Sequence, residues 1–314
     1  PGERVVVLTD PGRTVPLECE IIEAERTEGH GCEPHPDVWR AVFGCTAIGF
    51  LDTYGILEKI LAKEVEEVDQ ELLERWKNES RTMVPDAVLA VTYYSTSHTF
   101  FRKVLNELGT RYASMPLFEE YLLREDGPLA VDREILVESG RKLLASLKGA
   151  VKIEVKSPNG TELVFSVSGR DFHSDDGDLT QPGSFGNLPA GEVYVAPVEG
   201  QTNGILVLED GTRMEVEKGR CVKLTGDHPV KEIWKAHPEY FFIAELGMGT
   251  NPYASRPDNI LEAEKIAGTI HVAFGDNAGF GGTQRIPYHE DHVVYKPQIR
   301  VDGRLLELPV SKPL

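Results

Sequence analysis

The sequence predicts an α+β protein, with an N-terminal α/β layer domain over residues 1–149 and a β-rich domain over residues 150–314. Three observations support this prediction. The first half alternates short β-branched runs with amphipathic stretches, as layered strands and helices do. From residue 151 onward, short alternating segments are separated by turn signals, which is typical of antiparallel sheet. A length of 314 residues also suits two domains of ordinary size.

The N-terminal half opens with a strand over residues 4–9, where a β-branched run is followed by an Asp-Pro-Gly turn. The clearest helix covers residues 58–80, because its apolar residues recur every three or four positions. A second buried strand is predicted over residues 86–94. Further helices are predicted over residues 99–108, 116–124 and 133–147. Strands that alternate with helices in this way indicate an α/β layer.

The C-terminal half consists of short strands joined by turns. Residues 151–155 and 162–167 alternate apolar and polar side chains on either side of an Asn-Gly pair, which is a strong local signal for a hairpin. The later strands are predicted over residues 192–196, 204–208, 213–216, 240–244, 269–274, 293–295 and 298–301. This half therefore contributes the β-rich domain.

Charge and composition exclude several classes of protein. Lys and Arg number 33 against 51 Asp and Glu, so the net charge of −18 disfavours a broad basic face for nucleic acid. The four cysteines form no C-x-x-C pair, which indicates free thiols in a reducing compartment. The longest apolar run, residues 41–51, is shorter than the roughly 18 residues that span a bilayer. Since the first residues also lack the features of a signal peptide, we expect a cytoplasmic protein without a membrane or nucleic-acid partner.

Histidines and acids gather beside glycines in the second half. His289 and Asp291 form an H-x-D pair, which an extended segment would place on one face. An imidazole beside a carboxylate is the start of a divalent-metal site. His271, inside a predicted strand, is a candidate third ligand. Glu192 and Glu245 adjoin apolar runs, where a bare carboxylate is costly unless a cation accompanies it.

Other catalytic patterns are missing from the sequence. A Gly-x-Gly pair at residues 247–249 follows an apolar run, but Pro252 stands where a dinucleotide fingerprint needs its third glycine. The chain has no Walker A sequence, no H-E-x-x-H and no protein-kinase motifs. Nucleotide binding is therefore not predicted.

Four blocks of sequence stand in order along residues 85–310. They are G-R-D-F with P-G-S-F-G-N-L-P-A-G-E-V (169–172 and 182–193), A-E-L-G-M-G-T-N-P (244–252), E-K-I-A-G-T-I-H (264–271) and the H-x-D pair. Together they resemble the aminopeptidase T/aminopeptidase S metallopeptidases, a thermophilic metalloprotease-like fold. Residues 25–80 show no convincing match to that family.

The resemblance implies a metallo-aminopeptidase, a hydrolase that removes N-terminal residues from small peptides. It implies two divalent ions, of Zn, Co, Mn or Fe, held by Glu192, Glu245, His271, His289 and Asp291. Glu245 would bridge the ions, and Glu192 would act as a ligand or as a general base. A homodimer is implied in the same way.

One catalytic position departs from that family. The family carries a Tyr seven residues after the His of the third block, and here Ala278 stands in its place. Tyr288 is the candidate substitute.

Two other hypotheses remain open. The same blocks resemble the 2,5-dihydroxypyridine 5,6-dioxygenase type, in which one iron would lie on His271, His289 and Asp291 and the substrate would be a small aromatic molecule. A Glu would then act in acid–base chemistry. The third hypothesis is a non-catalytic homologue whose acids and histidines are satisfied by salt bridges.

Overall fold

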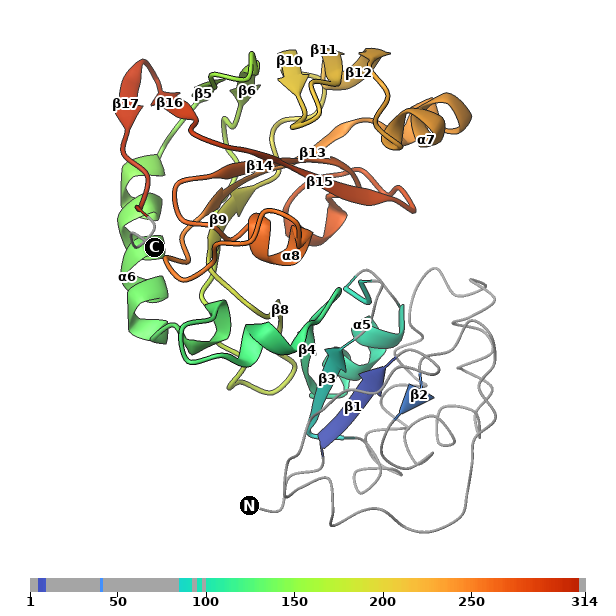
Figure 1. Ribbon diagram of the computed structural model, residues 1–314, viewed down its shortest axis with the longest axis vertical. Helices are drawn as coiled ribbons and strands as arrows, with labels where there is room; N and C mark the ends of the chain where they lie inside the picture. Colours follow the sequence, from blue (N-terminus) through green and yellow to red (C-terminus); the bar gives the residue numbers. More distant parts are fainter. Residues whose placement is uncertain (1–4, 10–39, 42–84, 92–94, 98–99, 311–314) are drawn as a thin grey trace. The chain divides into compact units, whose positions relative to one another are not determined.

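The computed structural model describes residues 5–9, 40–41, 85–91, 95–97 and 100–310 (Figure 1). The chain forms two compact units, residues 1–122 with 177–188 and residues 123–176 with 189–314. The helix predicted over residues 58–80 lies outside the described residues. The predicted boundary near residue 149 stays a prediction.

The first unit contains a sheet in the order β2-β1-β3-β4-β8. Strands β1, β3, β4 and β8 run parallel, and β2 is antiparallel to β1. Helix α5 (Phe100–Glu107) lies between β3 and β4 along the chain, so it connects two parallel strands. The bounds are β1 Val5–Thr9, β2 Arg40–Ala41, β3 Ala87–Val91, β4 Arg111–Ser114 and β8 Phe185–Asn187.

The second unit carries a seven-stranded sheet in which all pairs are antiparallel, in the order β12-β11-β10-β6-β5-β16-β17. The predicted hairpin is present as β5 and β6, and Gly160 in its turn has φ +97°, a conformation that favours glycine. The bounds are β5 Lys152–Lys156, β6 Glu162–Ser166, β10 Asn203–Val207, β11 Arg213–Glu217, β12 Arg220–Thr225, β16 Gln298–Val301 and β17 Arg304–Leu306.

A five-stranded antiparallel sheet completes the second unit, in the order β15-β14-β13-β9-β7. Every residue of β13 and β14 is buried, so both faces of these central strands are covered. The bounds are β7 His173–Asp175, β9 Glu192–Val195, β13 Ile243–Gly249, β14 Ile270–Gly275 and β15 His289–Val294.

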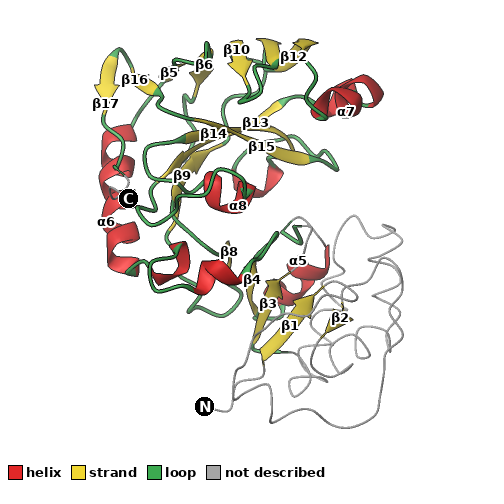
Figure 2. Cartoon of the chain, in the orientation of Figure 1, coloured by secondary structure: helices red, strands yellow, loops and turns green. Residues whose placement is uncertain are grey.

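Helices are few in the described part of the second unit (Figure 2). Asp132 caps α6 (Arg133–Leu147) by accepting a hydrogen bond from the backbone N–H of Glu134, and α6 packs against β7 and β9. The others are α7 (Val230–Ala236) and α8 (Ile260–Ala263), with the 3₁₀ turns η2 (Pro128–Ala130), η3 (Pro238–Tyr240) and η4 (Ala278–Phe280). The 3₁₀ turn η1 (Glu120–Leu123) lies where the first unit passes into the second along the chain. Mixed helix and sheet with sheet dominant confirms the predicted α+β class.

Three predicted elements have different bounds in the structure. The helix predicted over residues 116–124 is only the short turn η1, because Leu117 takes a left-handed backbone with φ 54°. The strand predicted over residues 240–244 begins at Ile243 and continues to Gly249, so Glu245 lies inside β13. The strand predicted from residue 293 begins at His289.

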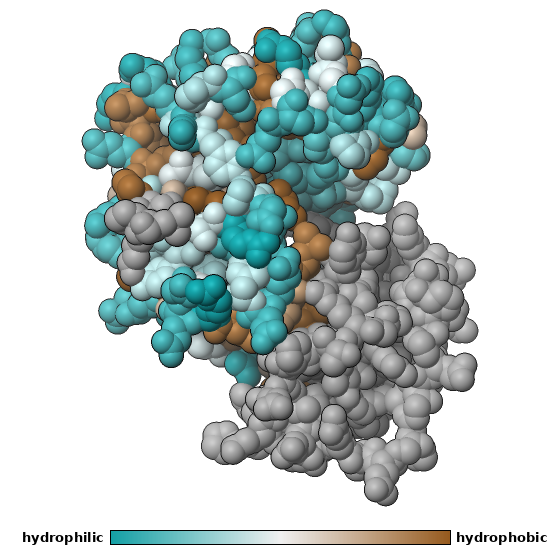
Figure 3. All heavy atoms as spheres, viewed as in Figure 1, coloured by the Kyte–Doolittle hydropathy of each residue, from teal (hydrophilic) through white to brown (hydrophobic). Residues whose placement is uncertain are grey.

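The core of the second unit draws on both of its sheets and on α6. Alternate residues of β6, Leu163 and Phe165, are fully buried in this core, as are Ile270 and Val272 of β14. On the visible surface, hydrophilic side chains dominate this unit and hydrophobic residues show between them (Figure 3). No helix among the described residues is long and apolar enough to cross a membrane.

Candidate metal centre

The face of the five-stranded sheet that points away from the core gathers the predicted ligands. On β14, Ile270 and Val272 enter the core, so the intervening His271 projects to the other face. The pairing register places Gly247 of β13 opposite His271, and Ala273 of β14 opposite both Glu245 and Asp291. Small residues opposite the ligands leave room for the larger side chains.

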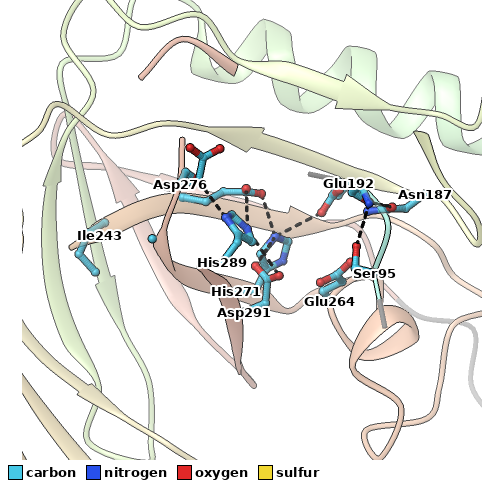
Figure 4. A network of polar contacts seen from close by, with 12 residues as sticks. Ser95, Asn187, Glu192, Ile243, Glu264, His271, Asp276, His289 and Asp291 are labelled. Carbon is cyan, nitrogen blue, oxygen red and sulfur yellow. Dashed lines mark hydrogen bonds and ion pairs between the residues drawn. The ribbon is translucent and has the colours of Figure 1, made fainter. Parts of the chain in front are cut away.

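His271 lies at the centre of the cluster and is 1% exposed. Its Nε2 is 3.2 Å from Oε1 of Glu245, 3.2 Å from Oε2 of Glu192 and 4.0 Å from Oδ1 of Asp291. Figure 4 shows the rings of His271 and His289 beside Asp291, with Glu192 to one side. Three acids from three strands therefore face one imidazole.

A backbone carbonyl group from a distant residue orients the imidazole of His289. Its Nδ1 lies 2.9 Å from the carbonyl oxygen of Asp276, and a carbonyl only accepts, so Nδ1 donates this hydrogen bond. The other nitrogen, Nε2, faces Oε2 of Glu245 and Oδ2 of Asp291, each at 3.7 Å. An imidazole anchored through one nitrogen and aimed through the other is the usual arrangement of a metal-ligating histidine.

The five predicted ligands form two overlapping groups. Glu192, Glu245 and His271 have ligand atoms within 4.8 Å of one another, and so do Glu245, His289 and Asp291. Glu245 belongs to both groups. The oxygen and imidazole donors, without thiolate, suit a divalent transition ion.

One buried atom of the cluster fits a cation. Oε2 of Glu192 has no hydrogen-bond partner among the described residues. A buried carboxylate oxygen in that state is costly unless a positive charge lies close to it. The cluster contains more acidic than basic side chains, and a divalent ion would offset this excess of negative charge.

The same acids control the protonation of both imidazoles. Burial would lower the pKa of His271, but the hydrogen bond to Glu245 and the charges of Glu192 and Asp291 raise it to about 9. Burial opposes the charge of His289 too, yet Asp291 and Glu245 raise the pKa of that imidazole to about 10. Burial would raise the pKa of Asp291, but His289 lowers it well below its usual range. The carboxylates of the cluster therefore favour positive charge beside them, and the protonated imidazoles supply that charge when no ion is bound.

Lys265 and Glu264 also belong to the cluster, although the sequence did not identify them as site residues. Nζ of Lys265 is 2.6 Å from Oε1 of Glu192 and 2.7 Å from Oε1 of Glu264. Both residues stand in the E-K-I-A-G-T-I-H block, so their signal was a charged pair six or seven residues before His271. No local pattern indicates that this pair is buried.

The structure does not bring Tyr288 to the ligands. Tyr288 precedes β15 and donates a hydrogen bond from its hydroxyl to Glu290. Since residues of a strand alternate between faces, Glu290 lies opposite the face that carries His289 and Asp291. Ala278 begins η4 and is half-buried.

Aromatic side chains adjoin the cluster. The ring of Phe280 meets His289 edge-on with centroids 6.3 Å apart, and it meets Tyr194 edge-on at 5.5 Å. Tyr194 lies on β9 opposite Gly247, beside the row that contains His271. The half-buried Phe280 therefore borders this cluster of acids and imidazoles.

A family model described as 2,5-dihydroxypyridine 5,6-dioxygenase matches residues 69–227, just over half of the chain. The matched residues include Glu192 and end before Glu245. A search of curated proteins finds no match.

Two similar solved structures each cover 77% of this chain and 73% of their own. One is 2,5-dihydroxypyridine dioxygenase from Pseudomonas putida KT2440, with 19% identity and a TM-score of 0.57. The other is wild-type AmpT from Thermus thermophilus, with 14% identity and a TM-score of 0.45. At such identities the first likeness shows a shared fold.

Proposed function

The chain belongs to the 2,5-dihydroxypyridine 5,6-dioxygenase family, and we propose that it is a metal-dependent enzyme that opens hydroxylated aromatic rings with dioxygen. One observation carries this proposal: His271, His289 and Asp291 converge on one side of the sheet. Two histidines and one carboxylate are the ligand set of non-haem iron(II) oxygenases.

The residues of the chain would hold the ion as follows. His289 offers Nε2, because its Nδ1 proton is engaged by the carbonyl of Asp276. His271 offers Nε2 from the central strand, and Asp291 offers a carboxylate oxygen. When bound, iron(II) would supply Lewis acidity toward ring hydroxyls and electron exchange with dioxygen.

Glu245 and Phe280 are the residues proposed to act on the substrate. A ring hydroxyl loses a proton when it binds as an anion, and Glu245, whose two oxygens face the two imidazoles, is the carboxylate placed to receive it. Phe280 borders the cluster with an aromatic ring that suits a planar substrate. In the overall reaction a ring carbon–carbon bond breaks and both atoms of O₂ enter the product, so no external reductant is consumed.

The test is oxygen consumption by the iron-loaded protein. Protein prepared with iron(II) under nitrogen is mixed with 2,5-dihydroxypyridine in aerated buffer, and dioxygen uptake and substrate absorbance are followed together. We expect one O₂ per ring opened, with loss of turnover in His271→Ala and Asp291→Ala. His237→Ala, which changes an exposed histidine outside the cluster, serves as the control. Failure to consume O₂ with any hydroxypyridine or catechol contradicts the proposal.

A metallo-aminopeptidase is the second candidate. The observation that favours it is the pair of overlapping ligand groups that share Glu245, since two ions with a bridging carboxylate are typical of such hydrolases. Its test is release of amino acids from dipeptides under nitrogen, with zinc or cobalt added. Hydrolysis without dioxygen, abolished in Glu245→Gln, would replace the dioxygenase proposal.

A further inference from the structure

Lys265 places a buried ammonium inside the cluster of acids. The residue is 1% exposed and follows the short helix α8. Its backbone is fixed on both sides, because its N–H bonds to the carbonyl of Glu262 and its carbonyl accepts from the N–H of Asn251. The position of the ammonium is therefore set by the fold and not by a mobile surface chain.

The ammonium engages only one end of the cluster. Nζ of Lys265 bonds to Oε1 of Glu192 at 2.6 Å and to Oε1 of Glu264 at 2.7 Å. Figure 4 shows Glu192 and Glu264 together on one side of the imidazoles. Within the described residues, no lysine or arginine lies within ion-pair distance of Glu245 or Asp291. The two ligand groups therefore differ in net charge, because only the group that contains Glu192 is bonded to an ammonium.

This difference separates the two groups as cation sites. In the group of Glu192, Glu245 and His271, one oxygen of Glu192 is already bonded to a cation. In the group of Glu245, His289 and Asp291, the printed ion-pair contacts of both acids among the described residues are with imidazoles, which bind an ion in their neutral form. An ammonium so near repels a second divalent ion.

We propose that Lys265 is a positioning residue that restricts the cluster to a single divalent ion, held by His271, His289 and Asp291 beside Glu245. Lys265 supplies the positive charge that a second ion would otherwise bring, and it fixes Glu192 beside the centre without making it a ligand. This inference rests on the proposed metal-dependent function and names the residue that decides its stoichiometry.

The experiment measures metal per chain. Wild type, Lys265→Met and Lys265→Arg are stripped with chelator, titrated with Co²⁺, desalted and analysed for cobalt by elemental analysis. We expect one equivalent in the wild type and in Lys265→Arg, and two in Lys265→Met. Lys223→Met, which removes an exposed lysine on the seven-stranded sheet, controls for loss of a charge elsewhere and should stay at one.

A second variant decides the matter if Lys265→Met does not fold. Glu192→Gln keeps Lys265, and we expect it to bind one equivalent with an affinity within about threefold of wild type. Asp291→Asn should bind at least 100-fold more weakly. Two ions in the wild type, one ion in a folded Lys265→Met, or loss of binding in Glu192→Gln would each overturn the inference. A wild type that binds no ion would instead overturn the proposed function.

Discussion

Gly247 on β13 lies directly opposite His271 on β14, and a Cβ atom at position 247 would lie 2.0 Å from both Cε1 and Nε2 of that imidazole. The two residues are 24 positions apart in sequence and share one row of the sheet. The absence of a side chain at Gly247 is what allows His271 to point its Nε2 along the face toward the acids.

We therefore expect Gly247→Ala to displace His271. The added methyl group has no room in a fully buried strand, so overpacking should cost about 1–3 kcal/mol of stability. The displaced imidazole should weaken metal binding by at least about 10–100-fold, the range seen when a ligand loses its orientation. Calorimetric titration with Co²⁺ and urea unfolding measure the two effects.

Gly279→Ala is the matched control for that substitution. A Cβ at Gly279 meets nothing within 4 Å, so the same chemical change should leave metal affinity and stability near wild type. Equal affinities in the two alanine variants would contradict the role assigned to the row of Gly247 and His271.

Metal removal should lower the thermal stability of the protein. An ion that binds only the folded state stabilises it by about 2.7 kcal/mol at one hundred times its Kd, which is a rise in Tm of about 5–10 °C for a unit of this size. Differential scanning calorimetry of chelated and metal-loaded protein measures the shift. Asp291→Asn should show little shift, and an equal shift in that variant would place the stabilising ion elsewhere.

Glu199 makes stability depend on pH outside the metal centre. It accepts hydrogen bonds from the backbone N–H of Thr283 at 2.8 Å and the side chain of Asn277 at 3.2 Å, and it pairs with Arg170. Partial burial opposes its charge, but these bonds lower the pKa of the Glu199 carboxyl. A lowered folded pKa means stability that is present above the unfolded value and lost as pH falls through the folded one.

Glu199→Gln should accordingly lower the free energy of unfolding by about 1 kcal/mol at pH 7. This is the contribution of a hydrogen bond to a charged group, reduced because Glu199 is partly exposed to solvent. The difference from wild type should narrow by pH 3.5, below the ordinary Glu pKa of about 4.3. Urea unfolding of both proteins at the two pH values measures it. A difference that widens in acid would contradict the assignment.

Cys221 should be unreactive in the folded protein. Its side chain is buried on β12, and burial raises the pKa of the thiol to about 12. The thiolate is the nucleophile, so alkylation by iodoacetamide at pH 8 should be at least about 100-fold slower than in unfolded protein. Mass spectrometry of the peptide that contains Cys221 follows the reaction before and after addition of urea. A folded rate within threefold of the unfolded one would show that the thiol is accessible.

Local pattern was sufficient for much of the fold. The alternation of residues 151–167 predicted the β5–β6 hairpin, and the helical period of residues 133–147 predicted α6. Each signal is carried by residues that are close together in the sequence. The helix predicted over residues 116–124 was wrong, because the left-handed backbone at Leu117 is not encoded in residue polarity.

The sequence by itself determined which side chains are available for chemistry: two histidines, three acids and an alternation that puts His289 and Asp291 on one face of a strand. Only the tertiary structure decided that Lys265 joins Glu192 and that Tyr288 bonds to Glu290 away from the ligands. The physical reason is that residue type and alternation are properties of a short segment. Register between strands and burial of an ion pair depend on hydrogen bonds and packing among segments that are far apart in the chain.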